Sequence, residues 1–157
     1  MNIEIKNRYT NKVIYSGEHP NLKQALEAVR KSGINLNNSS LIGSDLSKSL
    51  GLPEWIPVID NIDANILAAC TAPQCRLEMG NWHTCETTHC RAGWAVHLAG
   101  QAGKLLESQW GTEVAATLIY TVSRPGVRHP DFFVDNKTAM ASIEADADTA
   151  RKPVEAA

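Results

Sequence analysis

The chain lacks the features that place a protein in a membrane or recruit it to nucleic acid. No run of about twenty apolar residues, the length that crosses a bilayer, occurs in the sequence, and the first residues contain no apolar signal segment. Fifteen Lys and Arg against seventeen Asp and Glu give a formal net charge of −2, so no global field attracts nucleic acid or an anionic membrane. We therefore expect a cytoplasmic protein without membrane contact or direct nucleic-acid binding.

Cysteine and aromatic residues are also scarce. Four cysteines in a cytoplasmic chain are more typical of free thiols or metal ligands than of disulfides. The 157 residues, 43% of them hydrophobic, suffice for one core and do not require two large domains. Only 6% of the residues are aromatic, yet two of the four tryptophans lie within residues 81–94, beside two cysteines and two histidines. That stretch is therefore the first place to look for chemistry.

The first 33 residues predict a β-hairpin followed by a helix. Residues 3–8 and 13–18 are short β-type segments separated by a turn-like stretch. Asn21 is a natural N-cap for the segment LKQALEAVRKSG, whose apolar residues have helical spacing, and Gly33 suits the left-handed position after its end. We expect the hairpin to bury one face against this helix.

Leucine recurs with a step of five in residues 34–53, at positions 36, 41 and 46. Neither an α-helix nor a flat strand has that period, whereas a square β-coil does, with the central leucine of each pentad pointing inward. The run makes only about one coil, and stacked repeats need several coils to bury a core. The coil must therefore pack against neighbouring elements.

The pentads resemble those of pentapeptide-repeat proteins, and the match is carried by Asn35-Leu36, Ser40-Leu41 and Asp45-Leu46. The whole layout of residues 1–135, with a WHTCETTHCRAGW-like signature from Trp82 to Trp94, is similar to that of small proteins encoded by phages and prophages. The resemblance implies a short pentapeptide coil before a helical domain. It also implies a phage accessory protein in the host-cell cytoplasm, of which an inhibitor of a host defence system, including an anti-CRISPR type, is a concrete form.

The predicted fold class is α+β. Residues 1–57 are expected to form the hairpin, the helix and the pentapeptide coil, residues 58–145 a helical domain, and residues 146–157 a flexible tail. Two prolines flank Trp55 in the segment PEWIP, which predicts a stiff connection with an aromatic anchor between the two parts.

Apolar spacing predicts several helices after this connection. Residues 58–70 read as an amphipathic helix with Asp60 and Asp63 on its solvated face. Another helix is expected to start with Thr87 or Thr88 as N-cap and to break at Gly100 or Gly103. Further helices are predicted from residue 112 and from residue 136. The expected core includes Trp94, Leu98, Leu105, Trp110, Leu118, Met140 and Ile143.

The stretch NWHTCETTHCRAGW allows four interpretations. His83, Cys85, His89 and Cys90 supply zinc ligands, although adjacent residues 89 and 90 would diverge by about 100° on a helix. A catalytic thiol, Cys85 or Cys90, could use a nearby histidine as its base. A local disulfide between the two cysteines is geometrically permitted. We favour the fourth interpretation, a structural corner in which Trp82 packs under the helix start, the cysteines are small buried residues and the histidines form local hydrogen bonds.

The segment SRPGVRHPDFFV, residues 123–134, combines basic and aromatic side chains in one loop. We expect a docking turn whose Phe pair closes the helical core, rather than a nucleic-acid patch. The predicted interaction residues are Trp55, Arg124, Arg128, Phe132 and Phe133.

The leading functional hypothesis is a non-enzymatic accessory protein that acts by contact with a host or phage protein. It requires no cofactor. One alternative is a thiol- or zinc-dependent enzyme that uses Cys85, Cys90 and His83. Another is a structural virion component, which would self-associate, so a homo-oligomer also remains open.

Overall fold

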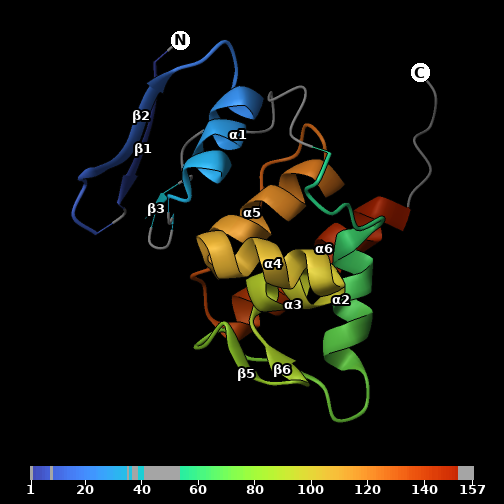
Figure 1. The fold of residues 1–157 in the computed structure, drawn as a ribbon. Helices are drawn as coiled ribbons and strands as arrows, with labels where there is room; N and C mark the ends of the chain where they lie inside the picture. The colour runs from blue at the N-terminus through green and yellow to red at the C-terminus, as the bar shows by residue number, and fades with distance from the viewer. Residues whose placement is uncertain (1, 8, 35, 37–38, 41–53, 152–157) are drawn as a thin grey trace, which may run out of the picture.

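The computed structural model of the chain describes residues 2–7, 9–34, 36, 39–40 and 54–151 (Figure 1). The elements follow one another as β1 (Asn2–Asn7), β2 (Val13–Glu18), α1 (Leu22–Ser32), β3 (Ser39–Ser40), α2 (Ile62–Thr71), β4 (Arg76–Leu77), β5 (His83–Cys85), β6 (Thr88–His89), α3 (Arg91–Leu98), α4 (Gly100–Trp110), α5 (Thr112–Ser123) and α6 (Asn136–Arg151). The α+β class is thus confirmed. No helix within these ranges has the length and apolar character needed to span a membrane.

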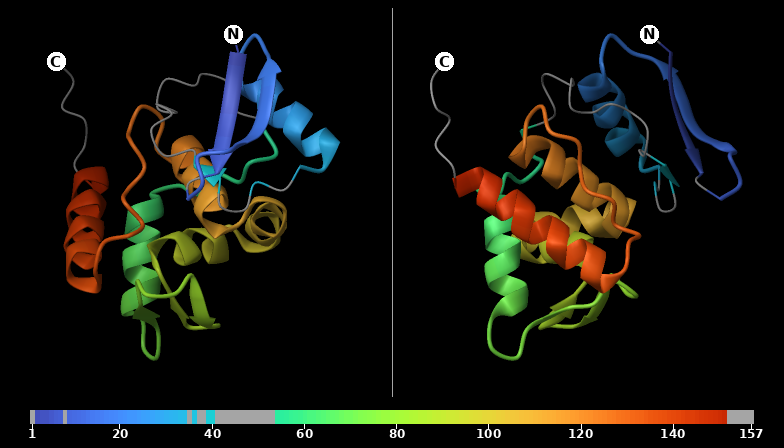
Figure 2. Two further views of the ribbon diagram at one scale, coloured as in Figure 1. Left: turned by 90° about the vertical axis from the view of Figure 1, so that its left-hand side faces the viewer. Right: turned by 180° about the vertical axis from the view of Figure 1, so that it is seen from behind.

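The N-terminal hairpin and helix form as predicted. Strand β1 pairs antiparallel with β2 on one side and with β3 on the other. The Asn21 side chain accepts a hydrogen bond from the Gln24 amide, and Gly33 ends α1 at a φ of 66°. Helix α1 lies between the hairpin and the later helices (Figures 1 and 2). Ile5, Leu26 and Val29 are buried and join the main core, so the two parts share one hydrophobic interior.

The predicted pentapeptide coil lies mostly outside the described residues. Leu36, the central residue of the first pentad, is fully buried. Residues 39–40 form β3, which pairs antiparallel with β1. Leu41 and Leu46 fall in the segment 41–53, outside the described ranges, so the coil is not part of the fold that can be described.

Trp55 joins the two parts of the molecule, as the flanking prolines predict. Its indole Nε1 donates a hydrogen bond to Glu27 Oε1 at 2.9 Å. The Arg30 guanidinium lies 4.7 Å from the ring centroid, and the Trp110 ring meets it edge-on at 5.5 Å. These contacts tie α1 to α4. The ring of Trp55 therefore packs within the molecule, and its predicted role as an interaction residue stays a prediction.

Helix α5 is the centre of the helical part, because every residue from Thr112 to Thr121 is buried. Helices α3 and α4 pack against it, and α2 packs along α6. Trp94, Trp110, Leu118 and Ile143 are buried as predicted, and Leu98 and Met140 pack at the edge of the core. Leu105 is 57% exposed, so its predicted place in the core is wrong.

Several predicted boundaries also change. Helix α2 begins at residue 62 rather than 58, and α3 takes Cys90 as its N-cap, because the threonines at 87 and 88 belong to a turn and a short strand. The predicted break is confirmed at Gly100, whose φ of 62° places it in the left-handed region. The tail predicted from residue 146 is wrong as far as Arg151, because α6 continues to that residue and buries Ala147.

Candidate functional site

The predicted motif folds into a small sheet that leads into α3. Strand β6 pairs in parallel with β4 and antiparallel with β5. The Cys90 amide donates to the Trp82 carbonyl at 3.2 Å, which closes the corner before the helix. Gly93 lies so close to the Trp82 carbonyl that a Cβ there would overlap it. The chain thus turns at Trp82 into α3, as the structural-corner interpretation expects, but Cys90 and not a threonine caps the helix.

The two cysteines of the motif lie in opposite surroundings. Cys90 is fully buried, its sulfur accepts a hydrogen bond from the Gly93 amide at 3.2 Å, and burial raises the pKa of its thiol to about 11. Cys85 is exposed, and hydrogen bonds from Thr87 and Thr88 lower the pKa of its thiol to about 7. The prediction that Cys85 is a buried hydrophobic residue is wrong. All four cysteines are free thiols, so the permitted local disulfide does not form.

The histidines of the motif form a chain that ends on two acceptors. His83 Nε2 lies 2.8 Å from Glu107 Oε1, and His83 Nδ1 lies 2.9 Å from His89 Nδ1. His89 Nε2 lies 3.2 Å from the Glu86 carbonyl oxygen. The His89 ring is buried against Trp94 and His97, with ring centroids at 4.5 and 4.8 Å. Burial, together with the charges of neighbouring histidines, lowers the pKa of His89.

These contacts bring only two of the four predicted zinc ligands face to face, His83 and His89. The Nε2 atom of each ring faces a glutamate oxygen, the Cys90 sulfur caps α3, and the Cys85 sulfur lies 3.5 Å from the Thr87 hydroxyl. Within the part of the chain that the structure describes, no group of three or more His, Cys, Asp or Glu side chains is arranged to hold a metal ion. The geometry thus does not support the zinc interpretation.

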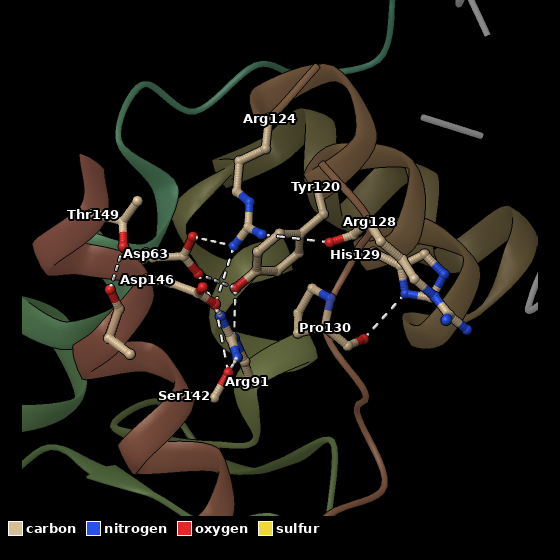
Figure 3. A network of polar contacts seen from close by, with 11 residues as sticks. Asp63, Arg91, Tyr120, Arg124, Arg128, His129, Pro130, Ser142, Asp146 and Thr149 are labelled. Atoms are coloured by element: carbon tan, nitrogen blue, oxygen red, sulfur yellow. Dashed lines mark hydrogen bonds and ion pairs between the residues drawn. The ribbon is translucent and has the colours of Figure 1, made fainter. Parts of the chain in front are cut away.

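A buried ion network, which the sequence did not predict, lies between α2, α3, α5 and α6 (Figure 3). Arg91 Nη2 lies 2.6 Å from Asp63 Oδ1 and 2.7 Å from Asp146 Oδ2. Arg124 Nη1 lies 2.5 Å from Asp63 Oδ2 and 3.2 Å from Asp146 Oδ2. The Tyr120 hydroxyl accepts from Arg91 Nε and donates to Asp63 Oδ1. We call these five residues the ion network.

The ion network is a structural element, because its charges are paired and most of its groups are buried. The side chains of Arg91 and Asp63 are 1% and 4% exposed. Burial raises the pKa of Tyr120, which keeps its hydroxyl protonated as a donor. Burial also acts to raise the pKa of Asp146, but the Arg91 hydrogen bond and the charges of Arg124 and Arg91 hold it below its usual value. The prediction that Asp63 is solvated is therefore wrong.

The loop of residues 124–135, the α5–α6 loop, carries four of the five predicted interaction residues. Arg124 belongs to the ion network and Phe132 is 3% exposed, with its ring 5.8 Å from that of Tyr120. Asp135 accepts hydrogen bonds from the amides at 137 and 138, which fixes the start of α6. The loop is therefore anchored at Arg124, at Phe132 and at Asp135.

The same loop also presents side chains to solvent. Val127 is 47% exposed, Phe133 is 48% exposed, and Arg128 is exposed. Phe133 rests edge-on against Trp82, with ring centroids 5.6 Å apart. Of the Phe pair predicted to close the core, only Phe132 is buried; Phe133 covers Trp82 and remains half exposed.

Two hollows flank the α5–α6 loop. The first is a cavity of about 270 Å³ at the start of the loop, with Asn61, Ile62, Asp63, Ser123, Arg124, Pro125, Val127, Asp146 and Thr149 in its walls. The second is an open hollow at the end of the loop, with walls that include Met79, Gly80, Phe133 and Lys137. The Met79 amide donates to the Asn136 side chain at 2.7 Å, which joins the two sides of this hollow.

The polar side chains of the ion network and of the motif are engaged in hydrogen bonds within the molecule. The carboxylates of the ion network already accept hydrogen bonds from arginine, tyrosine or serine side chains, and the motif histidines are bonded to one another and to glutamate groups. No protein-family model, curated protein or solved structure matches this chain.

Proposed function

We propose that this chain is a phage-type accessory protein that acts in the host cytoplasm by protein–protein contact and not by catalysis. The supporting observation is the α5–α6 loop, which is anchored by Arg124, Phe132 and Asp135 yet presents Val127, Arg128 and Phe133 to solvent between two hollows. Binding residues are often carried on loops that a rigid scaffold positions.

The anchoring of the loop matters for affinity. A flexible loop loses conformational entropy when a partner orders it, whereas a loop already held by buried contacts loses less. Arginine and aromatic side chains are also over-represented among the residues that dominate binding energy at protein interfaces. The exposed Arg128 and the half-exposed Phe133 supply both types within one short segment.

The first hollow is compatible with a protein partner. Small-molecule pockets usually enclose about 300–1,000 Å³. The cavity beside Arg124 encloses about 270 Å³ and has apolar walls at Ile62, Pro125 and Val127. A cavity of that volume has room for a side chain inserted by a partner.

The partner class follows from the resemblance to phage-encoded proteins. Small phage accessory proteins of this kind act on host proteins, and a component of a host defence system, including a CRISPR system, is the concrete partner that we propose. This step rests on the resemblance and not on a residue of the loop, because a fold alone does not identify a partner.

A matched pair of double variants tests the proposed surface. In the loop variant, Val127→Ser and Phe133→Ser remove two half-exposed apolar side chains. In the control, Tyr9→Ser and Val13→Ser remove two more exposed ones, at 73% and 50%, from the N-terminal hairpin. We expect the loop variant to lose the host protein that co-purifies with the wild type, and the control to retain it.

Circular dichroism and thermal unfolding must show that both double variants stay folded. A loop variant that retains the partner, or a control that loses it, would contradict the proposed surface. Native mass spectrometry of the purified chain decides the virion alternative, since a structural virion component would form large, stable homo-oligomers.

A thiol-dependent activity is the second candidate, and the surroundings of Cys85 favour it. This exposed thiol has a pKa of about 7, so a large fraction is thiolate at neutral pH. Iodoacetamide at pH 7 should label Cys85 at least about tenfold faster than Cys90, measured on peptides by mass spectrometry. Equal rates would contradict the assignment of the two thiols. If Cys85→Ser leaves partner binding and host phenotype unchanged, the reactive thiol has no part in the function.

A further inference from the structure

Three groups of the motif and the Glu107 carboxylate of α4 form one uninterrupted hydrogen-bonded chain. Its order is the Glu107 carboxylate, the His83 ring, the His89 ring and the Glu86 carbonyl, with contacts of 2.8, 2.9 and 3.2 Å. The two ends belong to different elements, because Glu107 lies on α4 and the other three groups lie on the hairpin β5–β6. The chain therefore connects the exposed hairpin to the helical core.

Counting protons along the chain gives its charge. A carbonyl oxygen and an ionised carboxylate only accept hydrogen bonds, and a neutral imidazole carries one N–H. The three contacts need three protons, whereas two neutral rings supply only two. The chain is complete only when it holds one additional proton. Thr112 Oγ1 also donates to Glu107 Oε1 at 2.6 Å, so this oxygen is the acceptor for two side chains.

The surroundings place the additional proton on His83. Its Nε2 faces Glu107, and the His83 side chain is 33% exposed. The His89 ring is buried and meets Trp94 and His97 of α3 as well as His83, so a second positive charge there is opposed by burial and by both neighbouring rings. The Glu86 carboxylate, on the exposed turn, is the remaining charged group that acts on His89.

We propose that His83 and His89 form a one-proton latch that holds the β5–β6 hairpin to α4 only within a bounded pH range. Above that range the chain loses its additional proton, and the contact between the two Nδ1 atoms then joins two hydrogen-bond acceptors. Below it, a second proton enters the buried His89 ring, which becomes an imidazolium facing a carbonyl, a second imidazolium and His97. The latch is a property of the fold and does not depend on the proposed partner.

The proposal fixes the direction in which the free energy of unfolding changes at low pH. The pKa of His89 is lowered in the folded protein, so the unfolded chain binds more protons at this position below the ordinary histidine value of about 6.5. The free energy of unfolding should therefore decrease as the pH falls below about 6.5. Because the two rings share a hydrogen bond, the two expected steps belong to the pair and not to one ring each.

Nitrogen NMR of the full-length protein, with ¹⁵N-labelled histidine, tests the latch. Between pH 5 and 9 we expect an intermediate range in which His83 is protonated on both nitrogens and His89 is neutral with its proton on Nε2. The backbone amide signals of His83 and His89 should move in two steps at the edges of that range. Two neutral rings throughout, a charge that resides on His89, or a single step would overturn the proposal.

Two glutamine variants provide the matched control. Glu107→Gln keeps an oxygen acceptor for His83 and Thr112 but removes the charge that favours the additional proton. Glu86→Gln changes an exposed side chain and leaves the backbone carbonyl at the other end in place. We expect the upper edge of the range to fall by about one pH unit in the first variant and by much less in the second. An unchanged upper edge in Glu107→Gln, or equal shifts in both variants, would contradict the latch.

Discussion

Asp63 shows how far the role of one residue can depend on distant parts of the chain. In the sequence it stands at the start of a helix, where carboxylates are common and usually solvated. In the structure it accepts hydrogen bonds from Arg91, Tyr120 and Arg124, which are 28, 57 and 61 residues away along the chain. Only the packing of four helices brings these groups together. Arg91 offered the one local signal, because it is a charged residue in a run of small apolar residues.

Removing the charge of Asp63 tests the ion network. Asp63→Asn keeps the size of the side chain but leaves two guanidinium groups without one of their carboxylates. Loss of one partner from a buried ion pair costs about 3–5 kcal/mol, so we expect the free energy of unfolding in urea to fall by that amount. Asp60→Asn, three residues earlier and exposed, should change it by less than about 0.5 kcal/mol. An Asp63 variant as stable as the control would contradict a structural role for the network.

At the scale of elements, local signals predict the long helices and fail for the short strands. The apolar period and the caps suffice for α1, α5 and the start of α6 because they act within a few residues. Strands β4, β5 and β6 have two or three residues each, which is too short for a two-residue period to show. From the sequence, the residues of β6 therefore resemble the start of α3, and the true N-cap, Cys90, belongs to a type that is uncommon at this position.

At Gly93, helix propensity and packing predict opposite effects of a substitution by alanine. In an exposed helix, replacing Gly by Ala raises the free energy of unfolding by up to about 1 kcal/mol. A Cβ at Gly93 would instead overlap the backbone carbonyl of Trp82, which cannot move without breaking the corner. We expect Gly93→Ala to destabilise the protein by about 1–3 kcal/mol in thermal or urea unfolding.

Gly80→Ala is the matched control for this prediction. The nearest atom to a Cβ at Gly80 is the Glu78 carboxylate, at the flexible end of a side chain 3.3 Å away. This substitution should have an effect of less than about 0.5 kcal/mol. A Gly93→Ala variant more stable than the wild type would contradict the close approach between α3 and the Trp82 carbonyl.

At the scale of the whole molecule, a single core joins the hairpin and the helical part, and Trp55 lies at the junction. The sequence predicts this junction because the prolines and the tryptophan are adjacent. It also identifies the α5–α6 loop, whose arginine and phenylalanine residues are close together along the chain. It does not predict which of them are anchors, since the burial of Arg124 and Phe132 depends on α2, α5 and α6.

The most direct test of contact through the α5–α6 loop is site-specific photo-crosslinking in host cells. A photo-reactive amino acid replaces Val127 in one variant, Phe133 in a second and Val13 on the hairpin in a third. We predict that positions 127 and 133 cross-link the same host protein and that position 13 does not. A cross-link from position 13 to that protein without one from either loop position would show that the hairpin, and not the loop, is the contact surface.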